Sequence, residues 1–104
     1  SEEHSADIRA RVLAARERQY ARQGADVCNA AIAPPQLAEH CPLSADASRM
    51  FAAAFQRLGL TARAHDRVLR VARTIADLAD SSVIEAEHLA EALQYRSLDR
   101  AAGS

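Results

Sequence analysis

Arg63, Arg67 and Arg70 recur along one predicted helix at spacings of four and three residues. These spacings place the three side chains on one stripe of an α-helix. Thr61 precedes the helix as a predicted N-cap, so Arg63 falls in the first turn, where free N–H groups and the helix dipole favour an anion. Guanidinium is the side-chain group suited to bidentate contact with a phosphate. The row therefore indicates a phosphate-contacting stripe that begins at Arg63.

The same arginine row has a second interpretation, as a solvated outer face of the helix. Asp66 and Asp77 lie on the same helix and can pair with its arginines. Rows of charge at helical spacing are usually solvent-facing. Spacing alone favours this second interpretation and leaves the phosphate-contacting one open.

The composition excludes several kinds of nucleotide chemistry for this chain on its own. All 13 basic residues are arginine, so the chain has neither a Schiff-base lysine nor the lysine of a phosphate-binding P-loop. Its three glycines are scattered, so a glycine-rich phosphate cradle is missing as well. We expect no catalytic residues, no ATPase activity and no cofactor bound by this chain alone. The net charge of −1 provides no overall field toward nucleic acid or anionic lipid.

Cys28, Cys41 and the neighbouring His40 are the residues that come closest to a metal site. Four convergent ligands are not available, and Cys41 is better explained as a small buried apolar residue. We therefore expect no structural metal, no obligatory disulfide and a reducing, cytoplasmic setting. We find no apolar span long enough for a membrane and no signal peptide, so we expect no membrane partner.

Hydrophobic periodicity and punctuation predict an all-α fold, a small bundle of about five helices. Ser44 is a predicted N-cap, and Gly59 followed by Leu60 is typical of a left-handed C-cap, so the third and fourth helices are expected to turn back on each other. No segment alternates with a period of two over enough length for a strand. The predicted helices are about 5–23, 34–41, 45–58, 62–79 and 85–96, with a loop over 25–33 and a frayed tail over 98–104.

Two apolar stripes predict how these helices pack. The fourth helix carries one broad apolar face, on which we expect Leu69 and Ile75 to point into the core. The first helix has a narrower stripe, with arginines crowding its other faces. The fourth-helix face comprises Val68, Leu69, Ala72, Ile75, Ala76 and Ala79, and the first-helix stripe comprises Ile8, Val12, Ala15 and Gln19.

Three runs of the sequence carry a resemblance to a known family. Residues 58–64 read LGLTARA, residues 67–78 read RVLRVARTIADL, and residues 88–96 read HLAEALQYR. They closely resemble the C-terminal domain of the magnesium-chelatase-like AAA+ ATPases, the family of competence protein ComM. The resemblance covers nearly the whole chain, in order. His65-Asp66 stands where the family pattern has Tyr-His, a departure that bears on local packing and leaves the arginine positions untouched.

The resemblance implies that residues 1–97 form the C-terminal helical lid of a larger AAA+ ATPase. In such lids an arginine near the start of one helix, called sensor 2, contacts the γ-phosphate of ATP. Arg63 matches that position, with Arg67 and Arg70 as secondary candidates. The resemblance also implies that the parent protein binds ATP and Mg²⁺, and that the lid's partners are the AAA+ core of the same chain and neighbouring subunits of a ring. The implied role of the parent is DNA processing, by branch migration during natural transformation.

Two other classes of protein remain open. A free-standing helical DNA-binding module would use the arginines of the first helix on the phosphate backbone, and its binding would depend steeply on salt. A histone-fold-like interaction module is suggested by a long helix followed by a short one after Val83-Ile84. Such a module would form a stable homodimer.

The prediction that the cysteines hold neither a structural metal nor an obligatory disulfide can be tested directly. We expect the helical circular-dichroism signal to persist in EDTA and in a thiol reductant, because neither cysteine has partner ligands in the sequence. Thermal melts with and without each reagent measure this. Loss of helical signal in either reagent would mean that a metal or a disulfide holds the fold.

Overall fold

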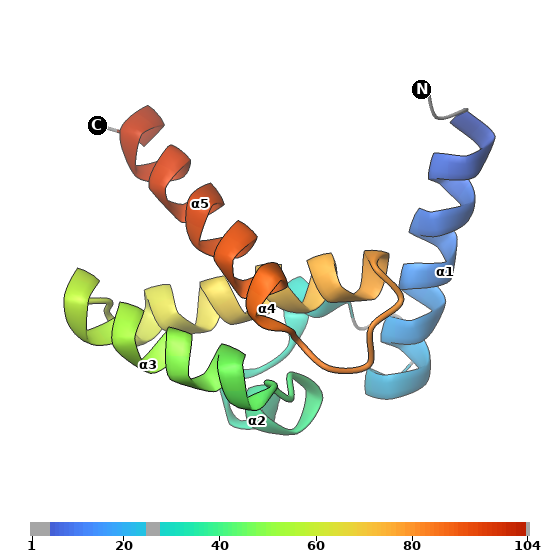
Figure 1. The fold of residues 1–104 in the computed structure, drawn as a ribbon. Helices are drawn as coiled ribbons and strands as arrows, with labels where there is room; N and C mark the ends of the chain where they lie inside the picture. Colours follow the sequence, from blue (N-terminus) through green and yellow to red (C-terminus); the bar gives the residue numbers. More distant parts are fainter. Residues whose placement is uncertain (1–4, 25–27, 104) are drawn as a thin grey trace.

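The computed structural model describes the backbone of residues 5–24 and 28–103, with side chains up to Tyr95. Within these ranges the chain forms five α-helices and two short 3₁₀ helices, and no strand (Figure 1). The prediction of an all-α bundle is confirmed. The elements are α1 (Ser5–Gln23), η1 (Asn29–Ala31), η2 (Pro34–Gln36), α2 (Leu37–His40), α3 (Ala45–Leu58), α4 (Ala62–Leu78) and α5 (Ala86–Gly103). None of the described helices is both long enough and apolar enough to cross a membrane.

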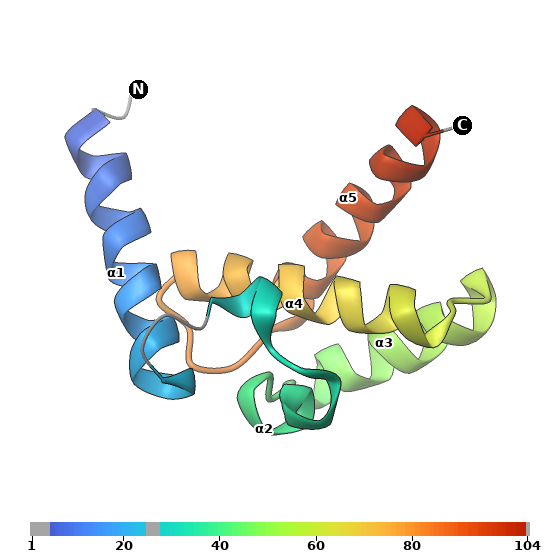
Figure 2. The same ribbon diagram turned by 180° about the vertical axis from the view of Figure 1, so that it is seen from behind.

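Helix α4 lies at the centre of the arrangement. Helix α3 runs beside α4, and α1 meets α4 near its C-terminal end (Figures 1 and 2). Helices α1 and α5 rise from α4 on the same side and diverge from each other. The fold is therefore a compact base of α2, α3 and α4 from which two helices project.

The predicted helix boundaries around α3 and α4 are made by local chemistry. The hydroxyl of Ser44 accepts a hydrogen bond from the N–H of Ala47, and that of Thr61 accepts one from the N–H of Ala64, each at 3.1 Å. Gly59 ends α3 with φ of 61°, a left-handed conformation that glycine adopts without steric cost. The chain turns back at Gly59 as predicted, and α4 runs beside α3, with the His65 ring of α4 stacked on Phe51 of α3 (Figures 1 and 2).

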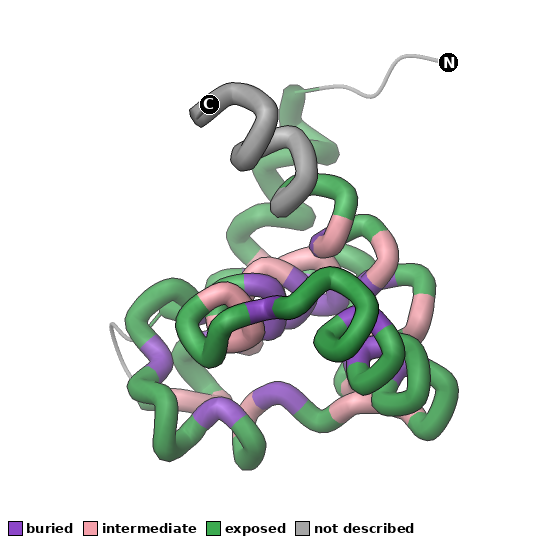
Figure 3. The backbone as a smooth tube through the Cα atoms, turned by 90° about the vertical axis from the view of Figure 1, so that its left-hand side faces the viewer, coloured by how far each residue is buried: buried purple, intermediate pink, exposed green. Residues whose placement is uncertain are grey.

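The core forms where α3, α4 and the first turns of α5 meet. Figure 3 shows buried positions through the middle of the fold, while the part of α1 near the N-terminus is exposed all round. Leu69 is buried as predicted, and Ile75 packs against the core while remaining partly exposed. Ala79 was predicted on this face and is exposed instead, because α4 ends at Leu78 and Ala79 is its C-cap. The other buried apolar residues include Ile32, Phe51, Val68, Ala72, Ala76, Ile84 and Leu89.

A single pair of backbone hydrogen bonds joins the starts of α3 and α5. The N–H of Ser44 donates to the carbonyl of Ile84 at 3.0 Å, and the N–H of Ile84 donates to the carbonyl of Pro42 at 2.8 Å. Leu43 and Ile84 thereby form an isolated parallel bridge. The segments before α3 and before α5, which are far apart in the sequence, are thereby joined at the edge of the core, where Ile84 is buried.

The outer helices differ from the sequence pattern in two places. Of the α1 stripe, Ala15 and Gln19 are buried, whereas Ile8 and Val12 are 44% and 39% exposed, because only the C-terminal half of α1 reaches α4. Helix α5 continues to Gly103, past Arg96 where its end was predicted, because the intervening residues contain no proline and propagate a helix readily. The boundary at residue 97 and the fraying of residues 98–104 stay predictions.

Truncation of Leu69 tests the placement of the core. Leu69→Ala is expected to cost about 2–5 kcal/mol in the free energy of unfolding, because it opens a cavity in a packed interior. Ile75→Ala is expected to cost less, since its side chain is only partly covered. Urea titration followed by circular dichroism measures both, with the exposed Leu58→Ala as a matched control. Equal losses for Leu69 and Leu58 would contradict this assignment of the core.

Candidate phosphate-binding arginines and the buried charge network

Arg63 lies in the first turn of α4, as predicted, with its side chain exposed to solvent. It makes no hydrogen bond or ion pair with the residues that the structure describes. Thr61 satisfies the N–H of Ala64, so the N–H groups of Ala62 and Arg63 are left without intrahelical partners. A permanent cation and two backbone donors are therefore available together at this helix end, an arrangement suited to an anion.

The other two arginines of the row have different surroundings. Arg67 is exposed but already interacts within the chain. Arg70 is half-buried, and its Nε and Nη2 both donate to the carbonyl of Ile32, at 3.1 and 2.9 Å. Arg70 therefore fastens the segment after η1 to α4. Of the three candidates, Arg63 has the guanidinium available to an external ligand.

Arg73 and Asp77, one helical turn apart on α4, form a fully buried ion pair. Both side chains are 0% exposed, and Arg73 Nη2 lies 3.1 Å from Asp77 Oδ1. Arginine and aspartate are almost never fully buried unless they are paired, because removing a charge from water costs several kcal/mol. Burial lowers the pKa of Arg73, and the Asp77 carboxylate opposes that shift. The spacing of this pair was visible in the sequence, but its burial was not predicted.

The Asp77 carboxylate also binds α1 and η1. Arg22 of α1 spans it, with Nη1 3.1 Å from Oδ1 and Nη2 3.0 Å from Oδ2. The Asn29 amide donates to Oδ2 at 2.9 Å and to the Thr74 hydroxyl at 3.0 Å. One carboxylate thus accepts from three separate elements. Below, these residues (Arg22, Asn29, Arg73 and Asp77) are called the Asp77 clamp.

Two further residues of α1, Arg18 and Gln19, make polar contacts near the same end of α4. Arg18 donates from Nη1 to the backbone carbonyl of Asp77 at 2.9 Å, and its Nη2 lies 2.6 Å from the Asp80 carboxylate. The buried Gln19 side chain accepts a hydrogen bond from the N–H of Asn29 at 3.0 Å. The contact between α1 and α4 is therefore mostly polar, with Ala15 as the buried apolar residue of α1.

The turn between α4 and α5 is held from inside by Arg73. Its Nη1 donates to the carbonyl of Ser82 at 3.1 Å and its Nη2 to that of Ser81 at 2.6 Å. The turn itself closes with the N–H of Ser81 on the carbonyl of Ala76 and a left-handed Asp80, at φ of 60°. This hydrogen bond pattern satisfies the last carbonyls of α4.

The cysteines and histidines of the described residues do not assemble a metal site, since no group of three His, Cys, Asp or Glu side chains lies close enough there. Cys41 is buried, as predicted, and burial raises the pKa of its thiol while Arg73 and Arg22 oppose the shift. Cys28 is exposed. The His88 ring accepts a hydrogen bond from the N–H of Glu85 at 3.0 Å and so caps the start of α5.

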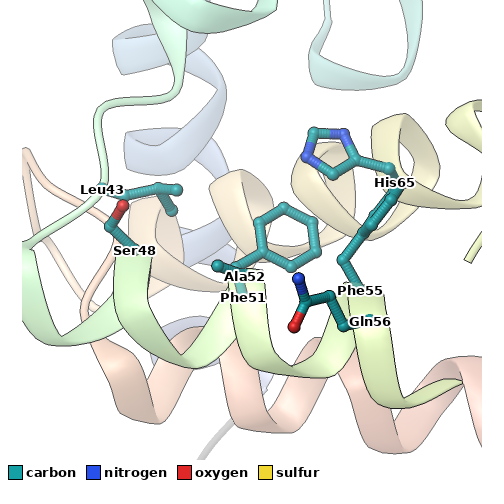
Figure 4. A pocket seen from close by; sticks show the side chains of 7 residues that line it. All are labelled: Leu43, Ser48, Phe51, Ala52, Phe55, Gln56 and His65. Atoms are coloured by element: carbon teal, nitrogen blue, oxygen red, sulfur yellow. The ribbon is translucent and has the colours of Figure 1, made fainter. Parts of the chain in front are cut away.

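An open hollow lies between α3 and the start of α4 (Figure 4). Its volume is about 430 Å³. His65 stacks on Phe51 with ring centroids 4.4 Å apart, and the Phe55 ring meets it edge-on at 5.6 Å. The His65 departure from the family pattern is thus accommodated by aromatic packing. The residues that line the hollow are Leu43, Ser48, Phe51, Ala52, Phe55, Gln56 and His65, which present no nucleophile with an adjacent base.

The structure is thus a helical bundle in which the first-turn Arg63 of α4 has no partner among the described residues and the last turn of α4 holds a buried charge network. The chain belongs to the family described as magnesium chelatase, subunit ChlI C-terminal, which matches residues 2–96. It is 43% identical over 98 residues to the uncharacterized protein YifB of Escherichia coli K12. It is 41% identical over 98 residues to competence protein ComM of Haemophilus influenzae. Each match covers 94% of this chain and 19% of the relative, and the resemblance found in the sequence is confirmed.

The Asp77 clamp gives a stability prediction. Asp77→Ala is expected to cost about 3–5 kcal/mol in the free energy of unfolding, because it leaves the buried Arg73 without its carboxylate. Asp80→Gly is the matched control. It removes an exposed ion pair and relieves a left-handed backbone, so its net effect is expected to stay within about 1 kcal/mol. Chemical denaturation of the two variants compares them. A loss at Asp77 no larger than that at Asp80 would show that the clamp contributes nothing to stability.

Proposed function

We propose that this chain is the C-terminal helical lid of a magnesium-chelatase-like AAA+ ATPase and that Arg63 senses the nucleotide. In this proposal the Arg63 guanidinium contacts the γ-phosphate of ATP held by the core of the longer protein. The observation that carries the proposal is the state of Arg63, which is exposed, in the first turn of α4, and without a partner among the described residues. An arginine kept free where backbone donors also point outward is suited to an anion.

The Arg63 guanidinium and the free N–H groups beside it can contact one terminal phosphate, but they cannot hold a whole nucleotide. The chain has no lysine and no glycine-rich loop to hold the remaining phosphates or Mg²⁺, so the core must bind them. During phosphoryl transfer negative charge develops on the transferred group and on the leaving oxygen. A positioned arginine can accelerate that step by orders of magnitude. Arg63 would then report the presence of the γ-phosphate to the rest of the lid.

The exposed half of α1 supports attachment to a further body of protein. Ile8, Val12 and Leu13 leave an apolar surface open on a helix that projects beyond the base. The chain spans about a fifth of the length of the relatives it matches, so most of each relative lies outside this domain. We propose that the AAA+ core of the same polypeptide, or a neighbouring subunit of a ring, covers this surface.

The motor role is proposed from the relatives. One of them is named a competence protein, which fits a DNA-processing motor active during natural transformation, with branch migration as its reaction. Direct DNA binding by α1 is less favoured, because Arg18 and Arg22 are committed to Asp80 and Asp77. Binding of DNA by the isolated chain with a steep salt dependence would favour that alternative.

The function proposed for Arg63 is tested by one substitution read in two systems. Arg63→Ala is expected to leave the melting temperature of the isolated chain nearly unchanged, since an exposed side chain without a partner contributes little to folding. In the full-length protein it is expected to lower ATP hydrolysis at least about tenfold.

The matched control is Arg49→Ala, which removes an arginine whose side chain is 72% exposed and which, within the described part of the chain, pairs with Asp46 on α3. Hydrolysis is expected to be unaffected by it. Unfolding of the isolated chain by Arg63→Ala would make Arg63 structural. Hydrolysis at the normal rate would refute the sensing role and direct the test to Arg67 or Arg70.

A further inference from the structure

We propose that the Asp77 clamp fixes the angle between α1 and α4, and that Arg22 is a positioning residue for Arg63 through it. The first half of the proposal concerns this chain alone. The second half rests on the nucleotide-sensing role proposed for Arg63.

The contact between α1 and α4 has little apolar shape to set its geometry. Helices usually fix their crossing angle by fitting ridges of large side chains into grooves. Here α1 buries Ala15 and Gln19 and no large apolar residue. Ile8 and Val12, the apolar residues nearer its N-terminus, are exposed. The angle must therefore depend on directional polar contacts.

Arg22 supplies the directional contact. Its two terminal nitrogens meet the two oxygens of Asp77 at 3.1 and 3.0 Å, and Nη2 also donates to the Asn29 side-chain carbonyl at 3.0 Å. A two-pronged contact between planar groups fixes orientation as well as distance. Gln19 closes a ring of contacts by accepting from the backbone of Asn29. Rotation of α1 about its contact with α4 would break several of these bonds together.

The charges in the clamp are arranged so that Arg22 can be removed while the fold persists. Two arginines face one carboxylate, and the second of them, Arg22, is 22% exposed at the edge of the network. Without Arg22, Asp77 keeps Arg73 and Asn29 as partners, and the buried charges remain balanced. Loss of Asp77 instead leaves Arg73 buried and unpaired. Arg22 is therefore the residue whose substitution separates positioning from folding.

Arg63 lies on α4, the helix that contributes Arg73 and Asp77 to the clamp, but at its opposite end. Asp77 is in the last turn of α4 and Arg63 in the first. Because α4 is one uninterrupted helix, any change in its angle to α1 displaces Arg63 relative to whatever α1 is attached to. Misplacement of a reacting contact by about 1 Å can cost up to roughly 10²-fold in rate. The clamp thereby links the position of α1 to the position of the proposed sensor.

The first test measures the angle in the 104-residue chain. Spin labels are attached to the substitutions Ala10→Cys on α1 and Ala53→Cys on α3, and both positions are exposed. Cys28→Ser removes the exposed native thiol. The other native thiol, Cys41, is 3% exposed and is therefore shielded from labelling. We expect one narrow distance distribution, and a shifted or broadened one in Arg22→Met. An unchanged distribution in a folded Arg22→Met variant overturns the proposal. If Arg22→Met does not fold, Arg22→Lys takes its place, because it keeps a charge against Asp77 and loses the two-pronged geometry.

The second test measures ATP hydrolysis by the full-length protein. Arg22→Met is expected to lower kcat about tenfold, and to lower it no further when Arg63→Ala is already present. The control Arg49→Met is expected to lower it in neither background. Equal reductions by Arg22→Met with and without Arg63 would mean that Arg22 acts on folding alone and would overturn the positioning role.

The two proposals fail in distinguishable ways. If Arg63→Ala leaves hydrolysis unchanged while the Arg22→Met distances shift, the sensing role is refuted and the clamp still sets the angle. If the distances do not shift while Arg63→Ala lowers hydrolysis, the sensing role stands and the clamp proposal is refuted.

Discussion

The carboxylate of Asp77 holds together the parts of this domain that the apolar core does not reach. It is completely buried and meets guanidinium groups from α1 and α4 and an amide from η1. A buried carboxylate of this kind is strongly destabilising if it is left unpaired, so enough partners to balance it, at least Arg73 and Asn29, must be in place for the chain to fold. The geometry of α1, of η1 and of the turn before α5 follows from this requirement.

The domain therefore has two halves held by different forces. On one side, α3, α4 as far as Ala76 and the start of α5 pack through leucine, valine, phenylalanine and alanine side chains. On the other side, the end of α4, α1 and η1 are joined by oriented hydrogen bonds. The apolar half is fixed by the close packing of its side chains, whereas the polar half is fixed by the direction of its bidentate ion pair. The end of α4 that carries Arg63 belongs to the apolar half, and the end that meets α1 belongs to the polar half.

The sequence was sufficient for features that depend on neighbouring residues. The caps at Ser44, Gly59 and Thr61 were predicted because each acts within a few residues of its own position. The burial of Arg73 and Asp77 could not be predicted in this way, because it does not depend on neighbouring residues. It depends on Arg22 and Asn29, which lie 55 and 48 residues from Asp77 along the chain. An i,i+4 pair between charged residues looks the same in sequence whether it is exposed or buried.

The projection of α1 could not be predicted for a related reason. Its apolar stripe has one period throughout, and period alone does not reveal where a neighbouring helix ends. The exposure of Arg63 was predictable from its place beside a cap. That Arg63 has no partner among the described residues, whereas Arg70 is bound to the carbonyl of Ile32, depends on the folded structure and could not be predicted from the sequence.

The bridge between Leu43 and Ile84 has a consequence for the order in which the chain folds. The α3–α4 hairpin needs only a short turn, so it can form early at little entropic cost. The bridge must close a loop that contains this whole hairpin, and it brings the first turn of α5 onto α4. The entropic cost of closing that loop is offset only when the hairpin already presents an apolar face against which α5 can pack. The bridge and the docking of α5 are therefore expected to form together, as one late cooperative step, which makes α3, α4 and the start of α5 a single unit in hydrogen exchange.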